Sequence, residues 1–115
     1  MRALILVLLI LGSAAAVPAA ANRFARSHAD PRAVLRLVER AEADYRASHG
    51  RYTASLAALG IERSADVDVR IVAEGAAGYS AVAIADAEEC AVFHGTARPP
   101  RGWVRTPARI ACRAS

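Results

Sequence analysis

The sequence contains no lysine, and all 15 of its basic residues are arginine. Together with the many alanines, this bias is more typical of GC-rich coding than of selection for guanidinium chemistry, so the arginine count alone assigns no function. Aromatic residues are also scarce, and each is expected to pack; they are Phe24, Tyr45, Tyr52, Tyr79, Phe93 and Trp103. With about 20 residues in a hydrophobic leader, the remainder has the size of one small domain.

Motifs for nucleotide binding or catalysis are missing as well, because no P-loop, no GxGxxG and no internal repeat is present. Ser80, Asp86 and His94 can be combined on paper into a triad, but no nucleophile elbow surrounds the serine. Cys90 and His94 are no better suited, since residues four apart on a strand lie about 13 Å apart, too far for a hydrogen bond. We therefore predict that the protein is not an enzyme and needs no cofactor.

Metal-binding patterns are weak. Glu88 and Glu89 are candidates for a calcium site, but no oxygen-rich loop accompanies them, so we interpret residues 86–89 as a polar turn. Cys90 and Cys112 lack CxxC spacing, and their nearest histidine is His94, which argues against zinc or redox chemistry. In an exported domain the two cysteines predict a structural disulfide, worth roughly 3 kcal/mol of stability in the chain-entropy model.

The N-terminus has the pattern of a leader. Arg2 precedes the apolar run ALILVLLIL, and small residues then offer cleavage sites ending at Ala16, Ala19 or Ala21. The uncharged stretch at residues 3–21 is also about long enough to span a bilayer as a helix. We predict a signal or anchor helix at residues 1–21 and one domain at residues 22–115, outside the cytoplasm in either case. Whether the leader is cleaved stays open.

Helical periodicity begins after this leader. Asp30 is placed to cap a helix that starts at Pro31 and ends near Ser48, where His49 and Gly50 stop it. The predicted apolar stripe comprises Val34, Leu37, Val38, Ala41 and Tyr45. The other faces are predicted to be solvated, and they carry Arg36, Glu39, Arg40, Glu42 and Arg46. Glu42 and Arg46 have the acid-first spacing of a helical ion pair.

Beyond this helix, Tyr52, Leu56 and Leu59 are expected in a turn or short helix that covers the edge of the core. The period then changes to two. ADVDVRIVAE at residues 65–74 predicts a strand that buries Val67, Val69 and Ile71, and GAAG at 75–78 predicts the turn to a second strand, YSAVAIA, at 79–85. CAVFH at 90–94 is predicted as a third strand and RIAC at 109–112 as a fourth, edge strand, separated by an irregular loop. This order defines an α+β fold, with a helix on one face of an antiparallel sheet of three or four strands.

Several of these stretches resemble type IV pilins and type II secretion pseudopilins. AEADYRASHGRYTASLAALGI at residues 41–61 is similar to the segment in which the long N-terminal helix of these proteins ends. GYSAVAIA at 78–85 and CAVFHG at 90–95 are similar to their sheet strands, and LGSAAAVPAAANRFARS at 11–27 to their N-terminal pattern. Cys90 and Cys112 resemble the pair that closes the C-terminal loop of many pilins. The resemblance covers nearly the whole chain, and it implies a long N-terminal helix packed on the sheet and assembly with other subunits through helix packing.

One element of the pilin pattern is absent. Residues 3–11 contain no acid, and the prepilin peptidase motif, a glycine before an aromatic residue with a glutamate five positions on, does not occur. In pilins that glutamate meets a neighbouring N-terminal amine inside an apolar bundle, where an unpaired charge is costly. We therefore expect either a coding region that begins further upstream or a derived pilin-like domain that is anchored or secreted by other means.

No acidic residue follows Glu89, so the C-terminal quarter of the chain is basic. Some pilin-like proteins take part in DNA uptake, which makes Arg98, Arg101, Trp103 and Arg105 candidate nucleic-acid contacts. For Trp103 we prefer the alternative role of a buried plug under the loop.

The sequence is thus interpreted as a non-enzymatic pilin-like component of the bacterial cell envelope, structural or interacting, of the minor pilin or pseudopilin type. Residues 3–21 would anchor it in the inner membrane, and its partners would be other pilin-like subunits or envelope proteins. The alternative is a soluble periplasmic or secreted binding domain, released by signal peptidase after about Ala21, for which nucleic acid bound through the basic segment is one candidate ligand.

Overall fold

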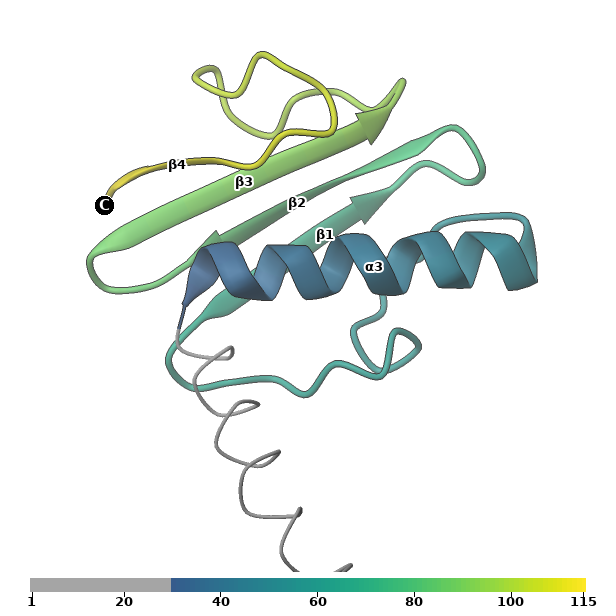
Figure 1. The fold of residues 1–115 in the computed structure, drawn as a ribbon, viewed down its shortest axis with the longest axis horizontal. Helices are drawn as coiled ribbons and strands as arrows, with labels where there is room; N and C mark the ends of the chain where they lie inside the picture. Colours follow the sequence, from purple (N-terminus) through teal and green to yellow (C-terminus); the bar gives the residue numbers. More distant parts are fainter. Residues whose placement is uncertain (1–29) are drawn as a thin grey trace, which may run out of the picture.

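The computed structural model describes residues 30–115, and the leader predicted at residues 1–21 lies outside this range. The described chain forms one helix, α3 (Pro31–His49), and then β1 (Asp68–Ala73), β2 (Gly78–Ile84), β3 (Glu88–Gly95) and β4 (Ala111–Ala114). All strand pairs are antiparallel, in the order β1-β2-β3-β4, and α3 lies across the sheet (Figure 1). The predicted α+β class is therefore confirmed. In residues 30–115 no helix is long and apolar enough to cross a membrane.

The ends of α3 follow from its local sequence. The Asp30 carboxylate accepts a hydrogen bond of 3.0 Å from the Arg32 N–H, and Pro31 occupies the first turn. At the other end Gly50 adopts a left-handed conformation with φ 75°, and its N–H donates to the Arg46 carbonyl. Both predicted helix signals are confirmed, and the helix extends one residue beyond the predicted end.

The buried face of α3 differs from the predicted stripe, because it consists of Pro31, Val34, Leu35, Val38 and Glu42. The prediction that Glu42 is solvated and paired with Arg46 is wrong. Glu42 has no exposed surface, and its Oε1 accepts a hydrogen bond of 2.9 Å from the Thr53 N–H. The physical reason is that the chain after Gly50 folds back over this end of the helix and supplies a backbone donor there.

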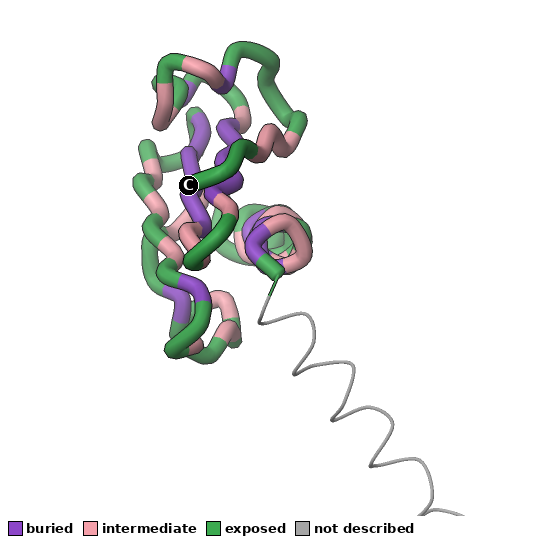
Figure 2. Tube along the Cα trace, turned by 90° about the vertical axis from the view of Figure 1, so that its left-hand side faces the viewer, coloured by how far each residue is buried: buried purple, intermediate pink, exposed green. Residues whose placement is uncertain are grey.

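The sheet buries side chains on both faces. On the face under α3, the core of the molecule contains Val34, Leu35, Val38, Val67, Tyr79, Ala81, Ala83, Cys90 and Val92. On the opposite face, Val82, Ala91 and Phe93 pack with Val104 from residues 96–110, which we call the C-terminal loop. Figure 2 shows the helix end-on at one side of the sheet. The predicted alternation along β2, with Tyr79 and Ala81 on one face and Val82 on the other, is confirmed.

All four strands have bounds that differ from the prediction, and the differences at β3 and β4 change the pairing of charged residues. Residues 88 and 89 belong to β3 instead of a polar turn, because Glu88 pairs with Ala114 and Glu89 with Arg113. Accordingly β4 runs from Ala111 to Ala114, two residues later than predicted. Pairing between β3 and β4 therefore extends both strands beyond the apolar residues from which they were predicted.

The segment between α3 and β1 covers one edge of the core, as predicted. It contains no helix of its own; residues 56–60 form turns, in which the Leu59 N–H donates to the Ser55 carbonyl. Leu56 is buried, and Tyr52 packs against the core beside Tyr79. The predicted turn over the core edge is therefore confirmed.

Candidate functional site

The C-terminal loop is closed at its base by a disulfide. Cys90 of β3 and Cys112 of β4 are directly opposite each other, with Cα atoms 4.0 Å apart, and their sulfurs are bonded. The predicted pairing is confirmed. Since both sulfurs are used in this bond, the nearby Glu88 carboxylate has no thiolate partner with which to bind a metal ion.

Glu89 fastens the same loop on the other face of the sheet. Glu89 is a buried residue, 8% exposed, and its carboxylate accepts a hydrogen bond of 3.0 Å from Arg101 Nε and lies 3.6 Å from Arg113 Nε. The Arg101 guanidinium also donates to the Pro100 carbonyl. A carboxylate held by two guanidinium groups joins the loop to the β3–β4 pair, which the sequence alone did not indicate.

Trp103 packs inward from the loop. It is partly buried against the cluster around Val104 and Phe93, and the Arg113 guanidinium lies 4.9 Å from its ring centroid. Its indole nitrogen is buried without a hydrogen-bond partner in the described part of the chain. This arrangement supports the predicted role as a plug under the loop over a role in base stacking.

Replacing Glu89 with alanine is expected to lower the free energy of unfolding by about 1–2 kcal/mol, because two guanidinium groups lose their shared partner in a partly buried site. Arg113 would then leave the Trp103 ring, and the loop would loosen. Trp103 is the only tryptophan in the sequence. Its fluorescence should therefore shift to longer wavelength in the native state.

The matched control for this change is Glu88→Ala, since Glu88 is the preceding acid of β3 and forms no ion pair within residues 30–115. It should leave the emission spectrum unchanged. Equal spectra for Glu89→Ala and the unmodified chain would contradict the fastening role of Glu89.

The four predicted nucleic-acid contacts do not share one environment. Arg98 and Arg105 are exposed, whereas Arg101 is paired with Glu89 and Trp103 is packed against the sheet. An alanine at Arg101 would therefore disturb the loop as well as any ligand contact. Nucleic-acid binding stays a prediction, and Arg98 and Arg105 are the two residues through which it can be tested cleanly.

A basic groove lies on the C-terminal-loop face of the sheet. Its volume is about 450 Å³, its floor contains Val72, Ser80 and Val82, and its lining is completed by Arg70, Glu74, Arg98, Pro99, Pro100 and Arg101. Arg98 forms no ion pair with any described residue. The lining contains three arginines and one acid, but Arg70 is ion-paired with Asp68 and Arg101 with Glu89, so Arg98 supplies the uncompensated positive charge among the described residues of the groove.

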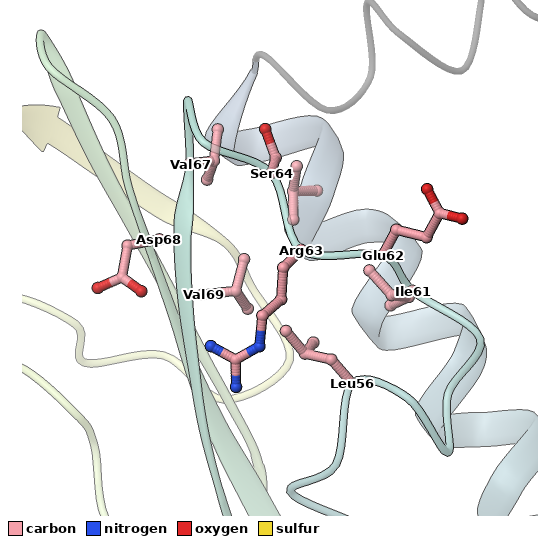
Figure 3. Close-up of a pocket in the computed structure, with 9 residues that line it drawn as sticks. Leu56, Ile61, Glu62, Arg63, Ser64, Val67, Asp68 and Val69 are labelled. Carbon is pink, nitrogen blue, oxygen red and sulfur yellow. The ribbon is translucent and has the colours of Figure 1, made fainter.

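A smaller apolar pocket lies on the opposite face of β1, next to α3. It holds about 80 Å³ and is lined by Val34, Leu56, Ile61, Val67 and Val69, with polar residues of the 62–68 segment at its rim. Figure 3 shows Val67 and Val69 pointing to the pocket side of β1 and Asp68 pointing to the other side. The pocket and the basic groove thus flank the same strand.

A polar and aromatic cluster joins α3 to the far end of the sheet. His94 of β3 forms a hydrogen bond of 2.6 Å with Glu39 of α3, and its ring stacks on Tyr79 with centroids 4.9 Å apart. The Tyr52 ring is tilted against the Tyr79 ring, with their centroids 4.9 Å apart. Burial and then the nearby carboxylates raise the pKa of Tyr79 above its usual range.

Glu42 completes this cluster from within the core. Burial raises the pKa of its carboxyl above the usual range, and the hydrogen bond from the Thr53 N–H opposes the shift only in part. Its second oxygen, Oε2, has no partner among the described residues, and neither has the Tyr79 hydroxyl. The carboxyl therefore holds the 51–54 turn against α3 by one hydrogen bond, at the cost of burying an ionisable group.

The candidate triad is not assembled. Ser80 lines the basic groove on the C-terminal-loop face, whereas His94 contacts α3 on the opposite face, and Asp86 lies in an exposed turn. Cys90, the other candidate nucleophile, is in the disulfide. The polar turn considered for calcium is also revised, because Glu89 is ion-paired in β3.

Comparison with protein-family models, with curated proteins and with solved structures gives no match to this chain.

Proposed function

We propose that this chain is a non-enzymatic pilin-like component of the bacterial cell envelope, of the minor pilin or pseudopilin type. The observation that supports this most directly is the order of the elements. A capped amphipathic helix comes first, it lies across one face of an antiparallel meander, and a disulfide closes a C-terminal loop. The sequence before α3, with its apolar stretch at residues 3–21, would continue as the anchor.

The outward face of α3 is available for subunit contacts. Its exposed residues recur at helical spacing and are Arg36, Arg40, Ala43, Asp44 and Ala47. Mixed charges with small residues between them permit a neighbouring helix to approach closely. The residues of the candidate triad lie apart, with Ser80 and His94 on opposite faces of the sheet. This separation favours a role in subunit contacts over a catalytic role.

The test uses the full chain with a C-terminal epitope, produced in a bacterial host with an intact envelope. A photo-reactive residue replaces Ala43 on the outward face of α3, and a matched control replaces Ala76 in the exposed β1–β2 turn. We expect the chain in the inner membrane with an intact N-terminus. We also expect more cross-links at position 43 than at position 76. The mature N-terminus is read by mass spectrometry.

A soluble product that begins at Asn22 would remove the anchor and with it the filament-type role. That result would leave the released periplasmic or secreted binding domain as the function. A membrane-bound chain without cross-links at position 43 would show that α3 makes no subunit contact.

A further inference from the structure

β1 forms one edge of the sheet and pairs only with β2. No other backbone hydrogen bond within residues 30–115 involves its six residues. An edge of this kind is a template for a further strand unless charge, a bulge or a covering segment blocks it. The preceding segment lies on the helix side of β1 (Figure 3).

The hydrogen-bond pattern shows which groups face outward. The Glu74 N–H donates to the Gly78 carbonyl, so this pair is a hydrogen-bonded one. Because such pairs alternate along an antiparallel ladder, Arg70 and Val72 also bond to β2. The N–H and C=O groups of Val69, Ile71 and Ala73 therefore point to the free edge.

The exposed face of β1 carries one ion pair and one large apolar side chain. Asp68 and Arg70 form an ion pair of 2.9 Å in which both side chains are more than half exposed. Val72, 61% exposed, is the large apolar residue that the described chain leaves in solvent. On the other face, Val67 and Val69 line the small apolar pocket. An apolar side chain of an added strand would extend this apolar surface.

The charges at this edge are self-complementary in two antiparallel registers, which are centred on Val69 and on Val72. Two copies centred on Val69 would place Asp68 of each copy opposite Arg70 of the other. A centre at Asp68 or at Arg70 would set two like charges face to face, and a centre at Ile71 would set Asp68 opposite Glu74. A centre at Val72 would set Arg70 opposite Glu74, but Glu74 lies beyond the end of β1, whereas Asp68 and Arg70 both lie within it. Opposite charges across a strand pair stabilise it and like charges destabilise it, so the charges within β1 select the register centred on Val69.

We propose that β1 pairs with β1 of a second copy of this chain, in the antiparallel register centred on Val69. The outward N–H and C=O groups of Val69 then bond to those of the other Val69, and Ile71 bonds to Val67. The result is one sheet that continues through both copies, with Asp68 and Arg70 exchanged into two intermolecular ion pairs. This interface does not depend on the pilin-like assignment.

The test measures self-association of the full chain in a non-ionic detergent by sedimentation velocity over a range of concentrations. The unmodified chain should form a reversible dimer. Arg70→Asp and Asp68→Arg should each weaken dimerisation by roughly tenfold or more, since each sets like charges opposite each other. Both side chains are exposed, so neither change should disturb the fold.

Two restorations make the result specific. An equimolar mixture of the Arg70→Asp and Asp68→Arg variants should form heterodimers, and the double variant with both changes should dimerise like the unmodified chain. Arg98→Ala removes a positive charge near the same face but outside the paired edge, and it should have no effect. Hydrogen exchange at the Val69 and Ile71 amides should slow as the dimer forms, whereas exchange at Ala81, inside the sheet, should not change.

A chain that stays monomeric at all concentrations would overturn the proposal. So would a dimer that is insensitive to both charge reversals, because such a dimer would have to form through another surface. Neither result bears on the N-terminal processing and membrane location that test the proposed function.

Discussion

Replacing Cys90 and Cys112 together by alanine is expected to lower the free energy of unfolding by about 3 kcal/mol. The bond joins residues 22 positions apart, so its loss restores conformational freedom to a long segment of the unfolded chain. Alanine is the appropriate replacement because Cys90 is fully buried in the core under α3, where a serine hydroxyl would lack a partner.

The loss should be largest at one edge of the sheet. β4 has only four residues and pairs with β3 alone, so without the disulfide it is held by one short ladder and by Arg113, which pairs with Glu89 and lies over the Trp103 ring. Hydrogen exchange at the β4 amides should accelerate more than exchange in β2. Urea unfolding monitored by circular dichroism gives the change in total stability.

Treatment with a thiol reductant provides the control. It should destabilise the unmodified chain to about the level of the double variant, and it should leave the double variant unchanged. Coincident urea midpoints for the oxidised chain and the double variant would contradict a stabilising role for the bond.

The second large effect is expected at Glu42. Glu42→Ala removes the acceptor of the Thr53 N–H and leaves that partly buried donor unpaired, so the free energy of unfolding should fall by about 1–3 kcal/mol. Glu42→Gln keeps an acceptor oxygen and a similar volume but carries no charge at any pH. Comparing the two variants separates the hydrogen bond from the ionisation.

The pH dependence follows from the direction of the pKa shift. Burial raises the pKa of Glu42 in the folded chain, so the folded state holds its proton more tightly than the unfolded state does. The contribution of this group to stability is complete below the unfolded pKa, and it decreases as pH rises from there through the folded pKa. The stability of Glu42→Gln relative to the unmodified chain should therefore increase over that interval.

Urea unfolding at a series of pH values from acid to neutral measures this difference. Asp44→Asn is the matched control, because Asp44 is an exposed acid on the same helix. Its stability relative to the unmodified chain should show no comparable trend. A constant difference between Glu42→Gln and the unmodified chain across the series would mean that burial does not perturb Glu42.

Much of the fold could be predicted because its signals are local. The Asp30-Pro31 start and the Gly50 stop of α3 each act within one helical turn, and the alternation of Val67, Val69 and Ile71 specifies one buried strand face. The disulfide could be predicted too, since the chain offers only two cysteines and no alternative partner.

Less of the candidate site could be predicted from the sequence, because the burial and pairing of its side chains depend on residues far along the chain. The position of Glu42 in the helical pattern does not decide whether it is buried or solvated. Its burial depends on the 51–54 turn, which packs over it. Glu89 resembled part of a polar turn, yet pairing with β4 and the return of Arg101 bury it. Local propensity cannot report such contacts.

By itself, the sequence determined the caps of α3, the α+β class, the meander of strands and the pairing of its cysteines. Only the tertiary structure decided that Glu42 is buried, that Glu89 and Trp103 fasten the C-terminal loop, and that β1 is left with an open edge. The physical reason is that helix and strand periodicities act over neighbouring residues, whereas burial and ion pairing depend on which distant segments the fold brings together.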